Sequence, residues 1–475
     1  MKLSQLFTAT LTAALFVSQT AAAISIDWTG GYRVEYTSVS RPSLASDKLS
    51  KDYALNFLYL QPRIIGSDGV NIVSRFDIMG SQIPAYKNSQ LGSVIGGGLN
   101  DGTGATGTNA TSQNQNSSSL QVSQLYLNVN HEYGSLLVGR TPIEFGLGIT
   151  HNAGKGQFDH WMDTKEVISY RFVVDNLSIA PMVARVSQAD FGGGVANDQI
   201  YIVEYNNKEA GARAGLFHQT RTAGPAYNDY SVGELPSGVT SATAGLKTQT
   251  VNIFLERKWQ PFEFKIEASF LTGNTGVQNA SGQEIKVDSY AVVMEGLFPA
   301  GESSWEYSGK AGVVSGDNKD TTDTYEGYIL DRNYDLGFLL FNHRLGSADI
   351  IGSSPLHAND TLGANKLSTQ NSADDEAVTN AMFFAPTVKY AYDDQVDLKG
   401  TIVYAQLMNA KKFVDMKKDL GLELDVELVY KPRERVTWST GFGMLMPGAA
   451  WEGGSTNNFD SKTTYGLTTR AAITF

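Results

Sequence analysis

The chain carries six histidines, the side chains best suited to acid–base catalysis or metal binding near neutral pH. None belongs to an H-E-x-x-H motif, and no serine lies in a G-x-S-x-G motif. His151 and His160 share one segment with Asp159 and Asp163, where hydrogen bonding within the segment is the simpler interpretation. The sequence therefore predicts no catalytic site and no enzyme activity.

Two other segments resemble ligand-binding motifs. Residues 102–107 match G-x-G-x-x-G, but no strand precedes them and no helix follows, and a dinucleotide site requires both. Asp317, Asp320 and Asp323 offer the carboxylate oxygens that Ca²⁺ prefers, although Lys319 breaks the EF-hand spacing. We predict a loop for the first segment and favour a solvated loop over a calcium site for the second. No cofactor is expected.

The composition limits the folds that can hold these residues. Of 475 residues, 48 are glycine, 22 tyrosine and 22 phenylalanine, only 18% are charged and none is cysteine. The lack of cysteine excludes a disulfide scaffold, and a net charge of −12 without a basic stripe argues against a nucleic-acid partner. A mean hydropathy of −0.21 and the lack of an apolar run of about 18 residues exclude a protein that crosses a membrane with helices.

Residues 1–23 have the pattern of a secretory signal peptide. Lys2 is followed by the apolar stretch Leu11–Val17, and Ala21 and Ala23 form an A-x-A cleavage site. We predict cleavage near Ala23, which leaves residues 24–475 as the folded protein. Export through an oxidising periplasm also suits a chain without cysteine.

After residue 24, apolar and polar residues alternate with a period of two in many segments. Between 26 and 36, for example, Trp28 and Tyr32 alternate with Asp27 and Arg33. These segments are about 10–12 residues long, close to the ~9–11 that a tilted strand needs to cross a bilayer. Because lipid tolerates no unpaired strand edge, such strands must close into a barrel with its apolar face outward. The sequence predicts an all-β fold, a single transmembrane antiparallel β-barrel.

The connections between these segments alternate between short and long. Eight short turns, with a first strand at 25–37 and a last one at 464–475, predict 18 strands. Short periplasmic turns and long extracellular loops are typical of outer-membrane barrels. Strand boundaries predicted from sequence carry errors of a few residues, so a count of 16 remains open. In the long outer loop 315–380, the apolar stretch 336–341 fits a further strand, a short buried piece or part of a loop folded inward. Segment 141–163 is the predicted constriction loop.

Aromatic residues and the C-terminal strand carry a resemblance to a known class. Trp28, Trp259, Trp305 and Trp438 all fall at predicted periplasmic strand ends, where an indole suits the membrane–water interface. The last strand alternates apolar and polar positions and ends at Phe475. This end is similar to the closing strand of Gram-negative outer-membrane proteins, and the chain resembles general and substrate-specific porins.

The resemblance implies a location and partners. The strand ending at Phe475 would be read by the outer-membrane assembly machinery, and the barrel would contact outer-membrane lipid and lipopolysaccharide as a monomer or a homotrimer. Residues 139–148 also resemble the stretch after the fifth strand in several porin families, including alginate-exporter-like barrels. In many porins the loop at this point narrows the lumen.

Strand parity predicts which charged residues line the lumen. Arginines concentrate on the early strands and carboxylates on the late ones, and opposed rows would create a field across the pore. We expect Arg75, Arg140, Arg171 and Arg185 to face the loop carboxylates. The simpler alternative is that these residues pair with neighbours and only make the wall polar. The full set of predicted pore-lining residues is Arg33, Arg75, Arg140, Glu144, Asp159, Asp163, Arg171, Arg185, Arg213, Glu263, Glu267, Glu306, Glu423, Asp425 and Glu427.

These observations favour a porin, a water-filled channel for passive diffusion of small hydrophilic solutes or ions, with a mild cation preference from its excess of acids. Three alternatives stay open. A substrate-specific channel or polysaccharide exporter of the alginate-export type predicts a lumen biased to one sign of charge. An outer-membrane hydrolase predicts a serine, a histidine and a carboxylate at the outer rim. A structural barrel without a pore predicts no conductance.

Overall fold

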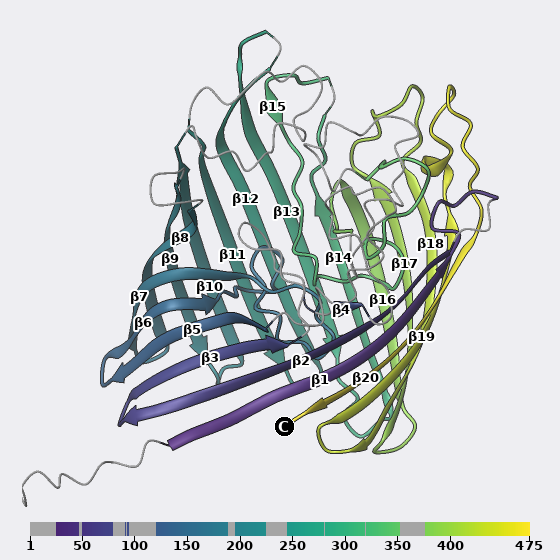
Figure 1. The fold of residues 1–475 in the computed structure, drawn as a ribbon. Coiled ribbons are helices and arrows are strands. Elements are labelled where there is room, and N and C mark those ends of the chain that lie inside the picture. The colour runs from purple at the N-terminus through teal and green to yellow at the C-terminus, as the bar shows by residue number, and fades with distance from the viewer. Residues whose placement is uncertain are drawn as a thin grey trace, which may run out of the picture.

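The computed structural model describes residues 25–46, 50–78, 91, 93–94, 120–188, 195–224, 245–279, 281–318, 320–351 and 376–475. In this part of the chain, 18 long antiparallel strands form one barrel (Figure 1). They are β1 (Ser25–Ser40), β2 (Ser50–Ser67), β3 (Val70–Ile78), β5 (Leu120–His131), β6 (Gly134–Pro142), β7 (Thr164–Val174), β8 (Leu177–Gln188), β9 (Val195–Asn207), β10 (Ala212–Ala223), β11 (Lys247–Trp259), β12 (Phe262–Gln278), β13 (Glu284–Phe298), β14 (Trp305–Val314), β16 (Ala381–Ala391), β17 (Val396–Leu407), β18 (Asp419–Arg433), β19 (Val436–Pro447) and β20 (Thr464–Thr474).

The first and last long strands pair with each other and close the barrel. β1 and β20 are antiparallel from Gly31 opposite Thr474 to Ser40 opposite Tyr465. Each long strand thus has a neighbour on both sides, which removes the free edges that a lipid environment forbids. The predicted all-β fold and the count of 18 are confirmed. The 18 long strands rule out the count of 16, and residues 336–341 form bends and turns, so no further strand lies there.

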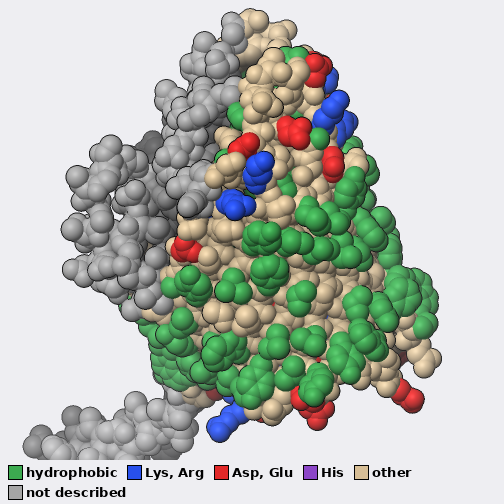
Figure 2. Space-filling model, turned by 90° about the vertical axis from the view of Figure 1, so that its right-hand side faces the viewer, with side chains coloured by type: hydrophobic (Ala, Val, Ile, Leu, Met, Phe, Trp, Pro, Cys, Tyr) green, Lys and Arg blue, Asp and Glu red, His purple; other side chains and the backbone are tan. Residues whose placement is uncertain are grey.

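The two faces of each strand differ as the period-two pattern predicts. In β1, Trp28, Tyr32 and Tyr36 are exposed on the outer face, whereas Arg33 and Glu35 are buried inside. Figure 2 shows large apolar side chains in a broad band on the outside, with charged side chains above and below it. Apolar-out and polar-in alternation is the pattern of barrels that cross a membrane.

The two ends of the barrel have different connections. The short ones are residues 68–69, 132–133, 175–176, 208–211, 260–261, 299–304, 392–395 and 434–435, all at one end. Phe475 lies at this end, where its backbone exchanges two hydrogen bonds with Gly30. Trp28, Trp259, Trp305 and Trp438 are about half exposed on strand segments near the same end. Most connections at the opposite end are longer, although residues 279–283 between β12 and β13 are a short one.

Two of the longer connections pack inside the barrel. We call residues 143–163, after β6, the first inner segment, and residues 326–351 the second inner segment. The largest buried apolar cluster forms where the second packs on the inner faces of β13, β14 and β16–β19. A smaller cluster joins Ile143 and Phe145 of the first to Phe217 and Phe254 of β10 and β11. The lumen is therefore partly filled by the chain itself.

Minor elements complete the described structure. β4 (Ser93–Val94) pairs with β2, β15 (Thr324–Tyr325) runs parallel to β13, and a 3-10 turn, η2, spans Ala449–Glu452. Over the described residues, no helix has the length and apolar character to span a membrane. The predicted signal peptide and the Gly102–Gly107 motif lie outside the residues that the structure describes.

Candidate functional site

A buried arginine fixes the first inner segment to the early strands. Arg33 of β1 donates hydrogen bonds to the carbonyl oxygen of Asp159 and, at 3.0 Å, to that of Leu91. Its Nε lies 2.9 Å from Glu35 Oε1, and Glu35 Oε2 lies 2.9 Å from His160 Nε2. A buried charge is tolerated only when it is paired and hydrogen-bonded. Arg33 and Glu35 therefore hold this part of the segment in place as a pair.

A carboxylate of the late wall holds the other end of this segment. Glu267 of β12 accepts a hydrogen bond from the Leu147 amide at 2.6 Å and one from Asn252 Nδ2 at 2.9 Å. Gly146 adopts a φ of 59°, and a Cβ there would lie 2.3 Å from the Glu267 carboxylate. Only glycine fits such a close approach in the left-handed region. The chain thus reaches Glu267 through the glycine at position 146.

A buried polar cluster joins the first inner segment to β7, β9 and β10. Lys165 Nζ lies 2.6 Å from Asp198 Oδ2 and donates to Gln219 Oε1 at 3.0 Å. Arg221 donates to both carboxylate oxygens of Asp198, at 2.8 and 3.0 Å. His151 Nε2 lies 3.1 Å from Gln219 Oε1. Burial, together with the Lys165 charge, lowers the pKa of His151, so its imidazole is neutral at pH 7.

A second wall carboxylate captures the second inner segment. Glu423 of β18 accepts hydrogen bonds from the amides of Phe338 (2.7 Å), Leu339 (2.5 Å) and Leu340 (2.7 Å). Asp425 Oδ2 accepts a further one from Phe338 at 3.0 Å. Three successive amides that point at one carboxylate form an anion-binding nest. The wall supplies the anion, and the segment supplies the nest.

The two inner segments also contact each other. Asn333 donates through Nδ2 to the Trp161 carbonyl at 2.7 Å and accepts from the Trp161 amide at 3.0 Å. The Asp331 amide donates to the Ile149 carbonyl at 2.8 Å, and the Arg332 guanidinium lies 4.3 Å from the centre of the Trp161 ring. Together the segments make one structure across the lumen, which we call the inner partition (residues 143–163 and 326–351).

Charged pairs line the wall around the partition. The predicted lumen residues Arg213, Glu263, Glu306 and Glu427 lie on inward positions and are all paired. The pairs are Lys165–Asp198, Arg171–Glu204, Arg213–Glu256, Lys258–Glu263, Lys265–Glu263, Lys310–Glu295, Lys389–Glu306, Lys399–Glu427, Arg470–Glu427 and Lys431–Asp397. Lysines pair with several late carboxylates, whereas Glu267 and Glu423 accept hydrogen bonds from backbone amides. The described late wall therefore carries both signs of charge, unlike the acidic wall that strand parity predicts.

The predicted constriction contacts also differ. Arg75 pairs with Asp77 of its own strand at 2.8 Å, instead of with a carboxylate of the first inner segment. Glu144 pairs with Lys155 inside that segment, and Asp163 accepts a hydrogen bond from the Asn152 amide at 3.1 Å. The segment carboxylates therefore organise the segment itself.

Two of the predicted constriction arginines lie on the outer face. Arg140 of β6 is opposite Leu125 of β5, which is exposed on the outside, and opposite Glu166 of β7. Arg185 of β8 is opposite Glu166 as well. Residues opposite one another on antiparallel strands point to the same side of the sheet. Arg140 and Arg185 therefore face away from the lumen.

The reason for this error is local. The lumen side of β8 is also apolar, because Met182 and Ala184 pack against Phe145 of the first inner segment. Where both faces of a strand are apolar, a period of two does not reveal which face is inside. The period-two pattern also does not reveal the buried pair Lys165–Asp198. The role of this pair depends on the first inner segment, which packs over it.

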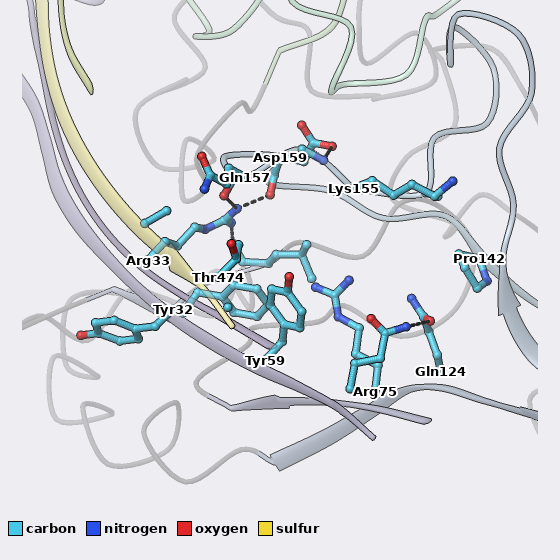
Figure 3. Close-up of a pocket in the computed structure, with 18 of the residues that line it drawn as sticks. Tyr32, Arg33, Tyr59, Arg75, Gln124, Pro142, Lys155, Gln157, Asp159 and Thr474 are labelled. Carbon is cyan, nitrogen blue, oxygen red and sulfur yellow. Dashed lines mark hydrogen bonds between the residues drawn. The ribbon is translucent and has the colours of Figure 1, made fainter. Parts of the chain in front are cut away.

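Among the cavities of the described residues, two partly open ones lie beside the partition. The larger, about 380 Å³, lies between β1–β5 and the first inner segment. Figure 3 shows Arg75 beside Tyr59 and Gln124 in this cavity, with Lys155 on its far side. The Arg75 guanidinium lies 4.4 Å from the centre of the Tyr59 ring. The smaller, about 210 Å³, is lined by Glu427 and the second inner segment.

The acidic loop has contacts of its own. Asp317 Oδ1 accepts a hydrogen bond from the Glu326 amide at 3.2 Å, and Asp320 pairs with Lys411. The carbonyl of Asp323 accepts a bond from the Lys286 amide at 2.9 Å. Throughout the described ranges, no group of three or more His, Asp or Glu residues is placed to hold a metal ion.

Comparisons with known proteins support the fold. No family model matches the chain, and no curated protein matches it. Two solved structures from Pseudomonas aeruginosa, OccK9 (OpdG) and OccK2 (OpdF), each align with a TM-score of 0.50 at 10% identity over 95% of this chain and 98% of theirs. A BenF-like porin from Pseudomonas fluorescens aligns with a TM-score of 0.49 at 8% identity, over 95% of this chain and 99% of its own. At these identities the likeness shows the barrel fold alone.

Proposed function

We propose that the protein is an outer-membrane porin, a water-filled channel for passive diffusion of small hydrophilic solutes or ions. The observation that carries this proposal is the opposite character of the two barrel faces. Outside, apolar side chains such as Ile168 and Trp28 are about half exposed or more, whereas inside the wall carries paired charges. A closed barrel with these faces suits lipid outside and water inside. The channel performs no chemistry and needs no cofactor.

The proposed location is the Gram-negative outer membrane, reached after signal cleavage near Ala23. The short turns face the periplasm, and Trp28, Trp259, Trp305, Trp438 and Phe475 lie at that membrane interface. The strand that ends at Phe475 is the proposed signal for the assembly machinery. Outer-membrane lipid and lipopolysaccharide surround the barrel. The protein is present there as a monomer or a homotrimer.

Solutes would pass the inner partition along the wall. Arg75, Arg171, Arg213, Glu263, Glu306 and Glu427 are the proposed path residues. Arg33, Glu267, Glu423 and Asp425 hold the partition, and Glu144, Asp159 and Asp163 shape the first inner segment. Paired charges replace part of a solute's hydration without binding it tightly, and a channel needs weak binding because its solute must also leave.

A substrate-specific channel or polysaccharide exporter is the second candidate. It would need a long path with one prevailing sign of charge. The described wall carries charged pairs of both signs, and the partition packs inside the lumen. Both features favour small solutes over a polymer.

Planar-bilayer recording tests the proposal. The purified full chain is expected to give discrete conductance steps, and a salt gradient is expected to reveal mild cation preference. Well-inserted protein without conductance would identify a structural barrel instead. A solute panel in the same bilayers separates general diffusion from preference for one solute.

A further inference from the structure

A row of three charged side chains lies on the outer face of the barrel. Arg140, Glu166 and Arg185 occupy opposite positions on β6, β7 and β8, so they are neighbours across the strands. Arg140 Nε lies 2.7 Å from Glu166 Oε1, and both side chains are about half exposed, at 48% and 49%. Arg185 is exposed as well, and its Nε lies 3.4 Å from Asn197 Oδ1. The row has two guanidinium groups on either side of one carboxylate.

The row lies at the upper limit of the apolar band. The next outward positions toward the short turns are Val138, Ile168 and Val183, also opposite one another. Ile168 and Val183 are 63% and 60% exposed. In the other direction, the outward positions are Pro142 and Thr164, where β6 ends and β7 begins. On β6, β7 and β8 the charges thus mark the change from apolar to polar surface at the end with long connections, whereas on β5 the exposed apolar residues Val122 and Leu120 continue toward that end.

This position constrains what the row contacts. An arginine on the lipid-facing side is costly at the bilayer centre, but its cost falls close to zero at the interface. In the proposed orientation this interface belongs to the outer leaflet. The row carries a net charge of about +1, since two arginines flank one glutamate. Arg140 uses Nε for Glu166 and one Nη1 hydrogen for the Val122 carbonyl. Three of its five N–H donors, one on Nη1 and two on Nη2, are left for a ligand.

We propose that Arg140 and Arg185 bind a phosphate group on the headgroup of an outer-leaflet lipid. Guanidinium groups bind phosphate oxygens through paired hydrogen bonds, and the exposed apolar row below them would contact the acyl chains of the same lipid. Glu166 separates the two guanidinium groups and limits their mutual repulsion. The inference rests on the proposed membrane location and goes beyond it by assigning a lipid site to named residues.

The test uses the full chain, folded in detergent, and measures thermal stability against added diphosphoryl lipid A. The double variant Arg140→Gln/Arg185→Gln is compared with wild type. Each basic group near an anionic surface strengthens attraction about fivefold, so the double variant is expected to need about thirtyfold more lipid A for the same stabilisation. Glu166→Gln removes the intervening negative charge and is expected to need less lipid A than wild type.

Controls separate the sources of an effect. The matched variant Arg171→Gln/Arg213→Gln removes two arginines that face the lumen and are 48% and 43% exposed, and its response to lipid A is expected to equal that of wild type. Thermal stability is also measured against dephosphorylated lipid A and against inorganic phosphate. Stabilisation by dephosphorylated lipid, or by inorganic phosphate alone, would overturn the proposal, as would an unchanged response of the Arg140/Arg185 variant. Bilayer conductance of the same samples reports separately on the proposed channel.

Discussion

Glu423 Oε1 lies 2.7 Å from the amide nitrogen of Phe338, so a wall carboxylate of β18 is joined to the backbone of a segment inside the barrel. The amides of Leu339 and Leu340 donate to the same carboxylate. Glu267 makes the corresponding contact with Leu147 of the other inner segment. In both places an acid on a strand binds backbone donors that would otherwise be unsatisfied in a closed lumen. These two wall carboxylates are therefore among the groups that hold the partition in place.

The variant Glu423→Gln is expected to loosen the second inner segment. The carboxamide keeps the size of the side chain, but its NH₂ group would face a backbone donor and the charge is lost. We expect a loss of about 3 kcal/mol in the free energy of unfolding, in the range for buried hydrogen bonds to charged groups. Denaturant unfolding in detergent measures it, and single-channel recording is expected to show a larger conductance.

The control for this variant is Glu434→Gln. Glu434 lies in the turn between β18 and β19, and its side chain is almost fully exposed. Its replacement is expected to change neither stability nor conductance. Equal behaviour of the Glu423 and Glu434 variants would show that the partition does not depend on the carboxylate at position 423.

A second prediction concerns the space beside Glu423. A Cβ on Gly337 would lie 2.8 Å from Val403 Cγ2 and 2.9 Å from a carboxylate oxygen of Asp425. Gly337→Ala is therefore expected to push the segment off the wall and to destabilise the protein by about 1–3 kcal/mol, as overpacking does. Gly400→Ala is the matched control, because its nearest contact would be 3.9 Å away. Denaturant unfolding compares the two, and a loss as large for Gly400→Ala would contradict the steric explanation.

The sequence predicts the barrel well and its interior poorly, for a physical reason. Apolar–polar alternation and turn residues are local features of the sequence. Short stretches of sequence therefore predict the number of strands, their ends, and the side of the sheet on which Trp28 and Arg33 lie. The contacts of the partition are between residues far apart in the chain. Nothing near Glu423 indicates that the amide of Phe338 will reach it. Arg185 shows the same limit, since its strand is apolar on both faces.

A third prediction follows from the buried His151. Burial and the Lys165 charge hold the pKa of His151 below its usual value of 6.5. The unfolded chain therefore binds a proton at this site more readily than the folded protein. Stability from the neutral imidazole is fully present above pH 6.5 and falls as the pH drops below that value toward the folded pKa.

The comparison of wild type with His151→Asn measures this effect. Unfolding free energies at about pH 7.5 and pH 5.5 are expected to differ less in the variant, because the depressed pKa is removed. His218 lies on the outward side of β10 beside Tyr201. The variant His218→Asn is the control, and the pH dependence of its unfolding free energy is expected to equal that of wild type. A wild-type protein that gains stability from this histidine on acidification would refute the assignment of a neutral imidazole.

The last prediction concerns ion preference. Glu427 Oε1 lies 2.8 Å from Arg470 Nη2, and its other oxygen lies 3.6 Å from Lys399 Nζ, beside the smaller cavity. Glu427→Gln leaves two cations with one fewer partner on the proposed path and is expected to shift the reversal potential toward anions. Lys399→Gln removes a positive charge from the same place and is expected to shift it toward cations. Both are measured in about a tenfold salt gradient, where ionic screening is kept equal for the two variants. Opposite shifts of the reversal potential in the two variants would place the ion path beside Glu427. Equal reversal potentials for both variants and wild type would place the path elsewhere in the lumen.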